Sequence, residues 1–129
     1  MSHYGYAVQD FSKIIRLDPK AASLWNGRCW DRAILGDLEN ALSDCDESLR
    51  LRPNNANTLD SRGFVYLKMK NAAEAIGNFN AALAIDPKKA SSLYGRGLAE
   101  LIKGDKSQSN AYIAAGKAID PKIANEFAK

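Results

Sequence analysis

Apolar residues recur along most of the chain at intervals of three and four residues, the spacing that forms one face of an α-helix. The clearest stripes are Leu59, Gly63, Tyr66 and Leu67, and then Ala75, Ile76, Phe79, Ala82 and Leu83. No segment alternates between apolar and polar residues for long enough to predict a β-strand. The pattern therefore predicts an all-α protein.

Turn-forming residues interrupt these stripes at regular places. The prolines of the chain are spaced 34 residues apart, at Pro19, Pro53, Pro87 and Pro121. Each is expected to end a helix, because a proline moves the residue before it out of the α conformation. Further turns are predicted between the prolines, at Gly36-Asp37, Lys70-Asn71 and Gly104-Asp105. A period of 34 residues predicts a repeated unit of two helices.

Aligning the chain at this period shows which positions of the unit recur. The units are taken to begin at Ala22, Ala56 and Ala90. Position 7 is then always arginine, position 8 is small, and position 24 is Cys45, Phe79 or Ile113. The alignment divides the chain into a partial repeat over 6–21, repeats over 22–55, 56–89 and 90–121, and a capping segment over 122–129.

The middle unit resembles a known repeat family. Its motif is Leu59-x2-Arg62-Gly63-x2-Tyr66, followed by Ala75-x3-Phe79 and Pro87. This is similar to the tetratricopeptide repeat, whose pattern is Trp-x2-Leu-Gly-x2-Tyr, Ala-x3-Phe and Pro with the same period. The resemblance implies one domain over 1–129, folded as a right-handed α-solenoid. The Arg-Gly form with Gly-Asp turns is similar to bacterial members of the family.

Several residues depart from the family pattern. Arginine stands at position 7 in place of leucine, and Cys29 replaces the glycine of position 8. Position 11 is charged in the outer two units, as Arg32 and Glu100. The arginines at position 7 are expected to pair with position 23 of the preceding unit, because a half-buried arginine needs a partner. The predicted pairs are Arg28 with Asp10, Arg62 with Asp44, and Arg96 with Asn78.

Composition and charge exclude several functions. The net charge of +3 is low and the charges are interspersed, unlike the clustered basic residues of a nucleic-acid-binding domain. No apolar run approaches the length of a membrane span, so we expect a soluble protein without membrane insertion. The first residues, "MSHYGY", do not form a signal peptide. A bacterial cytoplasmic location is expected, with the periplasm left open if an upstream signal has been removed.

Catalytic and metal-binding residues are scarce. The single histidine, His3, lies in a terminus that is expected to be frayed, so a nucleophile–histidine pair is not expected. No glycine-rich phosphate loop follows a strand. Two cysteines without clustered histidines are too few ligands for zinc. We therefore predict a protein that is not an enzyme and has no catalytic residue, metal site or cofactor.

Cys29 and Cys45 occupy positions 8 and 24 of the same unit, which are expected to face each other across the helix pair. Two small, buried, free cysteines are the favoured interpretation, since free cysteine is among the most buried residue types. A disulfide between them is the alternative.

The resemblance also implies where a partner would bind. In that family, positions 2, 5, 9, 12 and 13 of the first helices line a concave groove. Position 9 forms an apolar ladder of Trp30, Phe64 and Leu98, which predicts a site for a partner peptide or helix. Alternatively, the chain's own tail covers the ladder. The predicted groove residues are Asn26, Trp30, Asp60, Phe64, Lys68, Tyr94, Leu98 and Ile102.

The two ends of the chain give a second function hypothesis. Ala7, Phe11 and Ile14 fill core positions of a unit whose own first helix is missing. Together with Tyr4 they form a predicted association face. Either two copies of the chain meet there as a homodimer, or further upstream units cover it. At the other end, Ile123 and Phe127 are expected to face inward from a short helix. The favoured function is a protein–protein interaction module, and the alternative is an assembly role through the end faces.

Overall fold

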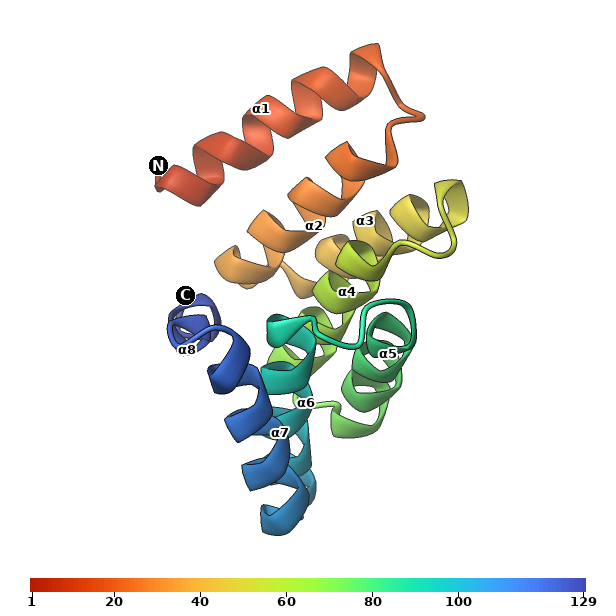
Figure 1. Ribbon diagram of the computed structural model, residues 1–129. Helices are drawn as coiled ribbons and strands as arrows, with labels where there is room; N and C mark the ends of the chain where they lie inside the picture. Colours follow the sequence, from red (N-terminus) through yellow and green to blue (C-terminus); the bar gives the residue numbers. More distant parts are fainter.

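The computed structural model describes residues 1–129 and contains only helices (Figure 1). This confirms the predicted all-α class. The helices are α1 (His3–Leu17), α2 (Ala22–Leu35), α3 (Leu38–Leu51), α4 (Ala56–Lys68), α5 (Ala72–Ile85), α6 (Ala90–Lys103), α7 (Lys106–Ile119) and α8 (Ile123–Phe127). The first of them corrects one expectation, because His3 begins α1 instead of lying in a frayed end. The Ser2 hydroxyl caps this helix by accepting a hydrogen bond from the Gly5 N–H at 3.1 Å.

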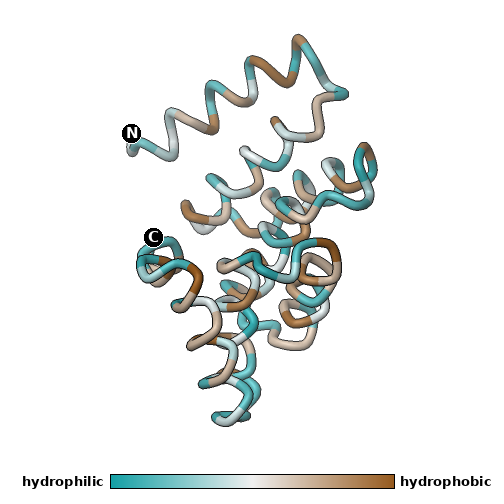
Figure 2. Tube along the Cα trace, in the orientation of Figure 1, coloured by the Kyte–Doolittle hydropathy of each residue, from teal (hydrophilic) through white to brown (hydrophobic).

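The helices form hairpins that stack along one direction (Figure 1). The hairpins are α2–α3, α4–α5 and α6–α7, and the first helices α2, α4 and α6 contact one another in series. The second helices contact the next first helix but not each other, so α2, α4 and α6 form an inner layer. Both hydrophobic and hydrophilic residues occur along the helices (Figure 2), and no helix combines the length and hydrophobicity needed to span a bilayer.

The turns inside the hairpins need a left-handed backbone. Gly36 and Gly104 adopt φ values of 85° and 98° after α2 and α6, and glycine takes such values without steric cost. Lys70 adopts φ 62° at the same place after α4, where this unit has no glycine. Asn71 and Asp105 then cap the second helices by accepting hydrogen bonds from the N–H groups of Glu74 and Gln108. The turn dipeptides therefore fix where each hairpin reverses.

A contact between positions 8 and 24 holds each hairpin together. Phe79 lies against Gly63 of its own hairpin and Gly95 of the next, and a Cβ atom at either glycine would come within 2.7 Å and 2.4 Å of its ring. Ile113 lies against Gly97 in the same way. The large side chain at position 24 thus fills the space left by the missing side chain of the glycine at position 8.

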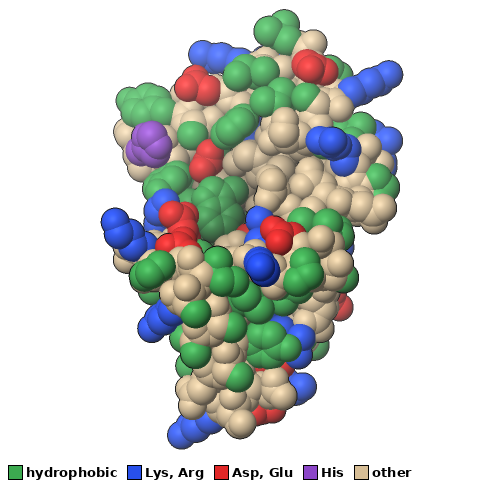
Figure 3. All heavy atoms as spheres, in the orientation of Figure 1, with side chains coloured by type: hydrophobic (Ala, Val, Ile, Leu, Met, Phe, Trp, Pro, Cys, Tyr) green, Lys and Arg blue, Asp and Glu red, His purple; other side chains and the backbone are tan.

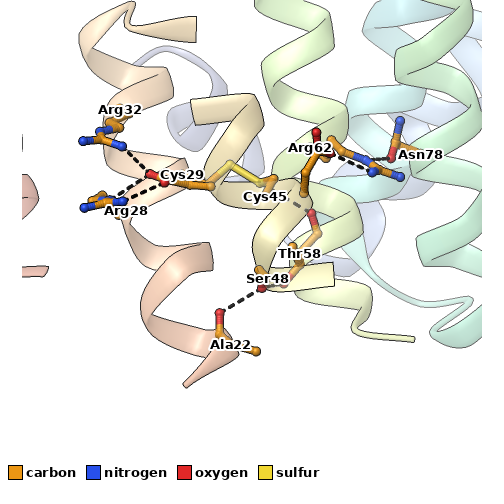
Figure 4. The surroundings of a disulfide bond; sticks show 11 residues. Ala22, Arg28, Cys29, Arg32, Cys45, Ser48, Thr58, Arg62 and Asn78 are labelled. Atoms are coloured by element: carbon orange, nitrogen blue, oxygen red, sulfur yellow. Dashed lines mark hydrogen bonds and ion pairs between the residues drawn. A yellow bond between two sulfur atoms is a disulfide. The ribbon is translucent and has the colours of Figure 1, made fainter. Parts of the chain in front are cut away.

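In the first hairpin a disulfide takes the place of this packing. Cys29 and Cys45 are fully buried and bonded to each other, with Cα atoms 5.5 Å apart (Figure 4). The favoured interpretation of two free thiols is therefore wrong, although the predicted facing arrangement is correct. The close approach of two helices at positions 8 and 24 gives a Cα separation within the range that a disulfide spans.

Exchanging the disulfide for the packing of the second hairpin tests this account. The Cys29→Gly/Cys45→Phe variant should lose about 3 kcal/mol of unfolding free energy for the missing cross-link. It should lose about 1–3 kcal/mol more because Ser61 stands where Gly95 receives Phe79. Adding Ser61→Gly should restore that second part. Urea unfolding measures the stability of the wild type, the double variant and the triple variant. A triple variant no more stable than the double variant would contradict this explanation of the packing.

The arginines of position 7 join neighbouring hairpins, but not with the predicted partners. Each contacts position 23 of its own hairpin and position 25 of the preceding one. The pairs are Arg28 with Asp44 and Ser12, Arg62 with Asn78 and Asp46, and Arg96 with Tyr112 and Asn80. The prediction of position 23 in the preceding unit was wrong because positions 7 and 23 face each other across one hairpin.

Asp44 is the most buried member of this network. The residue is 2% exposed, and its carboxylate accepts hydrogen bonds from Arg28 Nε and Nη2, both at 2.9 Å, and from Arg32 Nη1 at 2.8 Å. The charge at position 11 in the first unit is thereby explained, because Arg32 neutralises the same carboxylate. In the third unit Glu100 lies 3.7 Å from Arg96.

Removing the Asp44 carboxylate should be costly. Asp44→Ala leaves two half-buried guanidinium groups without their carboxylate and should lower the unfolding free energy by about 3 kcal/mol or more. Asp44→Asn should cost less, since Asn78 accepts from Arg62 at the same position. Asp46→Ala is the control, because its exposed pair with Arg62 should contribute less than about 1 kcal/mol. Equal losses for the two alanine variants, measured by urea unfolding, would contradict the network.

The N-terminal helix is only partly covered. Phe11 packs on Gly27, where a Cβ atom would come within 2.4 Å of its ring, as Phe79 packs on Gly95. It lacks the second contact that Gly63 gives Phe79. Tyr4, Ala7 and Phe11 are consequently half-buried, while Ile14 is 46% exposed. Tyr6 and Leu17 on the same helix are also exposed.

Candidate peptide-binding groove

The inner layer carries the predicted groove residues on three helices. Asn26 and Trp30 lie on α2, Asp60, Phe64 and Lys68 on α4, and Tyr94, Leu98 and Ile102 on α6. The C-terminal segment, residues 122–129, also lies on this layer, because α8 packs on α6 (Figure 1). In Figure 3, hydrophobic side chains gather beside the C-terminus, next to acidic and basic ones.

An apolar hollow of about 330 Å³ lies between α4, α6 and the C-terminal segment. Its lining is apolar apart from two lysines, and consists of Phe64, Leu67, Lys68, Lys70, Leu98, Leu101, Ile102 and Phe127. Leu101 and Ile102 remain exposed to solvent. We call this the apolar hollow.

The aromatic ladder is partly covered by the chain itself. Trp30 packs on Phe64 with ring centroids 4.4 Å apart. Phe127 approaches Phe64 edge-on at 5.6 Å and lies 5.1 Å from Tyr94. Phe64 is therefore only 2% exposed. At this position the chain's own tail covers the ladder, which was the alternative interpretation of the sequence. Trp30 and Leu98 remain half-buried.

A polar hollow adjoins the ladder on its other side. It has a volume of about 380 Å³ and is lined by Asn26, Gly27, Trp30, Asn57, Asp60, Ser61, Ser91 and Glu126. The Asn26 Oδ1 atom is buried and has no hydrogen-bond partner. An unpaired buried acceptor is costly. The residues around one hollow are mostly apolar in type, and those around the other are mostly polar.

Asp60 is a buried acid in the lining of the polar hollow. The Ser92 hydroxyl donates a hydrogen bond to its Oδ1 atom at 2.5 Å. Burial raises the pKa of Asp60 above its ordinary value, and the bond from Ser92 and the charge of Lys89 only partly oppose that rise. Ionised Asp60 is thus a source of instability inside the groove.

Asp60→Asn should stabilise the protein at neutral pH, because asparagine keeps an acceptor for Ser92 without the buried charge. The folded protein holds the Asp60 proton more tightly than the unfolded chain does. Its contribution to stability is therefore complete below the unfolded pKa and is lost as the pH rises through the folded pKa. Urea unfolding between about pH 3 and about pH 7 should show the variant gaining on the wild type as pH rises. A difference independent of pH would contradict this.

The structure contains no group of three His, Cys, Asp or Glu side chains that could hold a metal ion. Both cysteines are used in the disulfide. Sequence analysis did not place Phe127 in the groove, although it did predict that this side chain faces inward. Leu67, Leu101, Asn57 and Ser91 were also left out of the predicted set, although their positions in the unit, 12 and 2, indicated the concave face.

Comparisons with known proteins agree with this architecture. A family model described as tetratricopeptide repeat matches residues 56–89. TTC0263, a thermophilic TPR protein of Thermus thermophilus, is similar with a TM-score of 0.87 at 17% identity, over 97% of this chain and 71% of that one. MamA from Desulfovibrio magneticus RS-1, from residue 41 to its end, is similar with a TM-score of 0.78 at 24% identity, over 95% and 70%. The first TPR domain of human RPAP3 has a TM-score of 0.75 at 18% identity, over 85% and 89%.

No curated protein matches the sequence. Stacked helical hairpins with their first helices on the inside define an α-solenoid. Residues 56–89 match the tetratricopeptide repeat, and the fold of the whole chain is similar to the solenoid of TPR proteins such as TTC0263.

Proposed function

We propose that this protein is an interaction module whose groove binds a segment of a partner protein. The family's repeats generally form non-catalytic scaffolds for protein–protein interaction, which supports the module in general terms. The main observation in favour of the groove as the binding site is that the apolar hollow and the polar hollow lie beside each other on the inner layer. Such a surface holds an apolar anchor at one end and hydrogen-bonds a peptide at the other.

The exposed apolar residues of α6 are the part of the groove that a partner would reach first. Ile102 is 42% exposed and lines the apolar hollow. Phe64 is a poorer probe, because its substitution would disturb the core beneath α8. Trp30 is half-buried and borders the polar hollow.

A displayed peptide library tests the proposal. Peptides selected on the wild type should lose about 2 kcal/mol or more of binding free energy to Ile102→Glu, the size typical of a central interface anchor. Trp30→Ala should weaken the same peptides. Ile85→Glu is the matched control, because Ile85 is similarly exposed but lies at the end of α5, outside both hollows. Failure to select any peptide sensitive to Ile102→Glu would refute the groove as the site.

A second candidate function is assembly through the N-terminal face. Phe11 lacks one of the two glycine contacts that Phe79 has, and Ile14 is exposed beside it. A second copy of the chain would cover this surface. Sedimentation equilibrium should then show a dimer for the wild type and a monomer for Ile14→Glu. A monomeric wild type at high protein concentration would exclude the homodimer.

A further inference from the structure

We propose that the uncovered side of α1 is a docking site for one α-helix of a partner protein, and that this helix carries an arginine followed directly by a glycine. The site lies outside the groove, and its occupant differs from the second copy of the chain considered above. Helix α1 lacks contacts that the other second helices of the fold make, and those contacts define what would fit.

Helix α1 is a second helix without a first helix beside it. It contacts α2 and no other helix, whereas α3 contacts both α2 and α4, and α5 contacts both α4 and α6 (Figure 1). The difference is visible at positions 20, 23, 24 and 27 of the repeat, which are all buried in α3 and in α5. None of them is buried in α1, where they are Ala7, Asp10, Phe11 and Ile14.

The first missing contact is a glycine packed on Phe11. At the equivalent place in the second hairpin, Gly63 lies so close to the Phe79 ring that a Cβ atom would come within 2.7 Å of it. Phe79 meets a second glycine in the next hairpin, and Phe11 keeps that contact, at Gly27. The open side of Phe11 therefore accepts a glycine, since a larger residue at that distance would collide with the ring.

The second missing contact is an arginine on Asp10. Position 23 of a hairpin pairs with the arginine of position 7, as Asp44 does with Arg28 through two hydrogen bonds of 2.9 Å. Asp10 stands at the same position of α1 and is exposed. Arg28 also bonds to α1, but to Ser12 and not to Asp10. The open carboxylate thus complements an arginine placed directly before the glycine, because positions 7 and 8 are consecutive.

A third residue sets what lies earlier in the docked helix. Position 27 is small in the complete hairpins, as Ser48, Ala82 and Gly116. It lies close to the first helix, since a Cβ atom on Gly116 would come within 3.1 Å of the Cβ atom of Tyr94, at position 5. Helix α1 has the larger Ile14 there, so the docked helix needs a small residue at its own position 5. The expected pattern is a small residue, any residue, arginine and glycine.

A second copy of the chain offers no such helix. Its two arginine–glycine pairs, Arg62-Gly63 and Arg96-Gly97, already pack inside their own hairpins. Its α1 is uncovered but contains no arginine before a glycine. The occupant that fits both Asp10 and Phe11 is therefore a helix of another protein.

A synthetic helix tests the proposal on the full-length protein. The probe is a fluorescein-labelled peptide of residues 55–69 carrying Asp60→Ala, which has the expected pattern, and binding is followed by fluorescence anisotropy. The peptide should bind the wild type, and Asp10→Arg should weaken binding at least about tenfold. A peptide that also carries Arg62→Glu should bind Asp10→Arg more tightly than the wild type. A peptide that carries Gly63→Leu should not bind.

Further variants locate the binding. Asp10 is exposed, so Asp10→Arg should leave the melting temperature unchanged. Ile102→Glu alters the groove and should leave the affinity of this peptide at the wild-type value. Ile14→Ala removes bulk from the docking site, so it should let a peptide that keeps Asp60 bind as tightly as the Asp60→Ala peptide does.

Two results would overturn the inference. No binding, or binding that ignores either Asp10→Arg or Gly63→Leu, would show that α1 does not take such a helix. A wild-type dimer in sedimentation equilibrium that the peptide cannot dissociate would show that a second copy is the occupant. The proposed groove would survive both results, because its library peptides depend on Ile102 and not on Asp10.

Discussion

The fold depends on a contact between two residues sixteen positions apart, at positions 8 and 24 of each helical hairpin. A small residue on the first helix and a larger one on the second let the helices approach until they interlock, as Gly63 and Phe79 do. The same register brings positions 7 and 23 together one residue earlier. Arg28 therefore meets Asp44, and Arg62 meets Asn78, on the flank of the apolar contact. One spacing thus sets both the apolar contact inside a hairpin and the polar pair beside it.

Periodicity was sufficient to predict the helices, because their ends are set by local chemistry. A proline or a glycine with positive φ acts within a few residues of itself, so Pro53 and Gly36 mark boundaries in the sequence that the structure retains. The direction of the arginine pairs was not predictable in this way. It depends on which second helix lies nearer to position 7, and that is a property of the stacked hairpins.

The disulfide and the covered groove show a different limit. Cys29 and Cys45 were correctly placed face to face, but the composition of a core does not decide whether two thiols are bonded. The path of the chain after Pro121 leaves the repeat pattern, and periodicity carries no information there. Phe127 could be predicted to face inward, but not to reach Phe64, which lies in another hairpin. The candidate groove was therefore predicted as an open surface, and a covering tail was only the alternative interpretation.

The covalent link has a mechanical consequence. It closes a loop within one hairpin, between α2 and α3, and joins no hairpin to the next. If the ends of the solenoid were pulled apart, contacts between hairpins would separate first along this part of the chain. The residues between Cys29 and Cys45 would add nothing to the extended length while the bond stayed oxidised. A stretched molecule would thus be shorter in its oxidised form than in its reduced form, with the difference confined to the hairpin that presents Trp30.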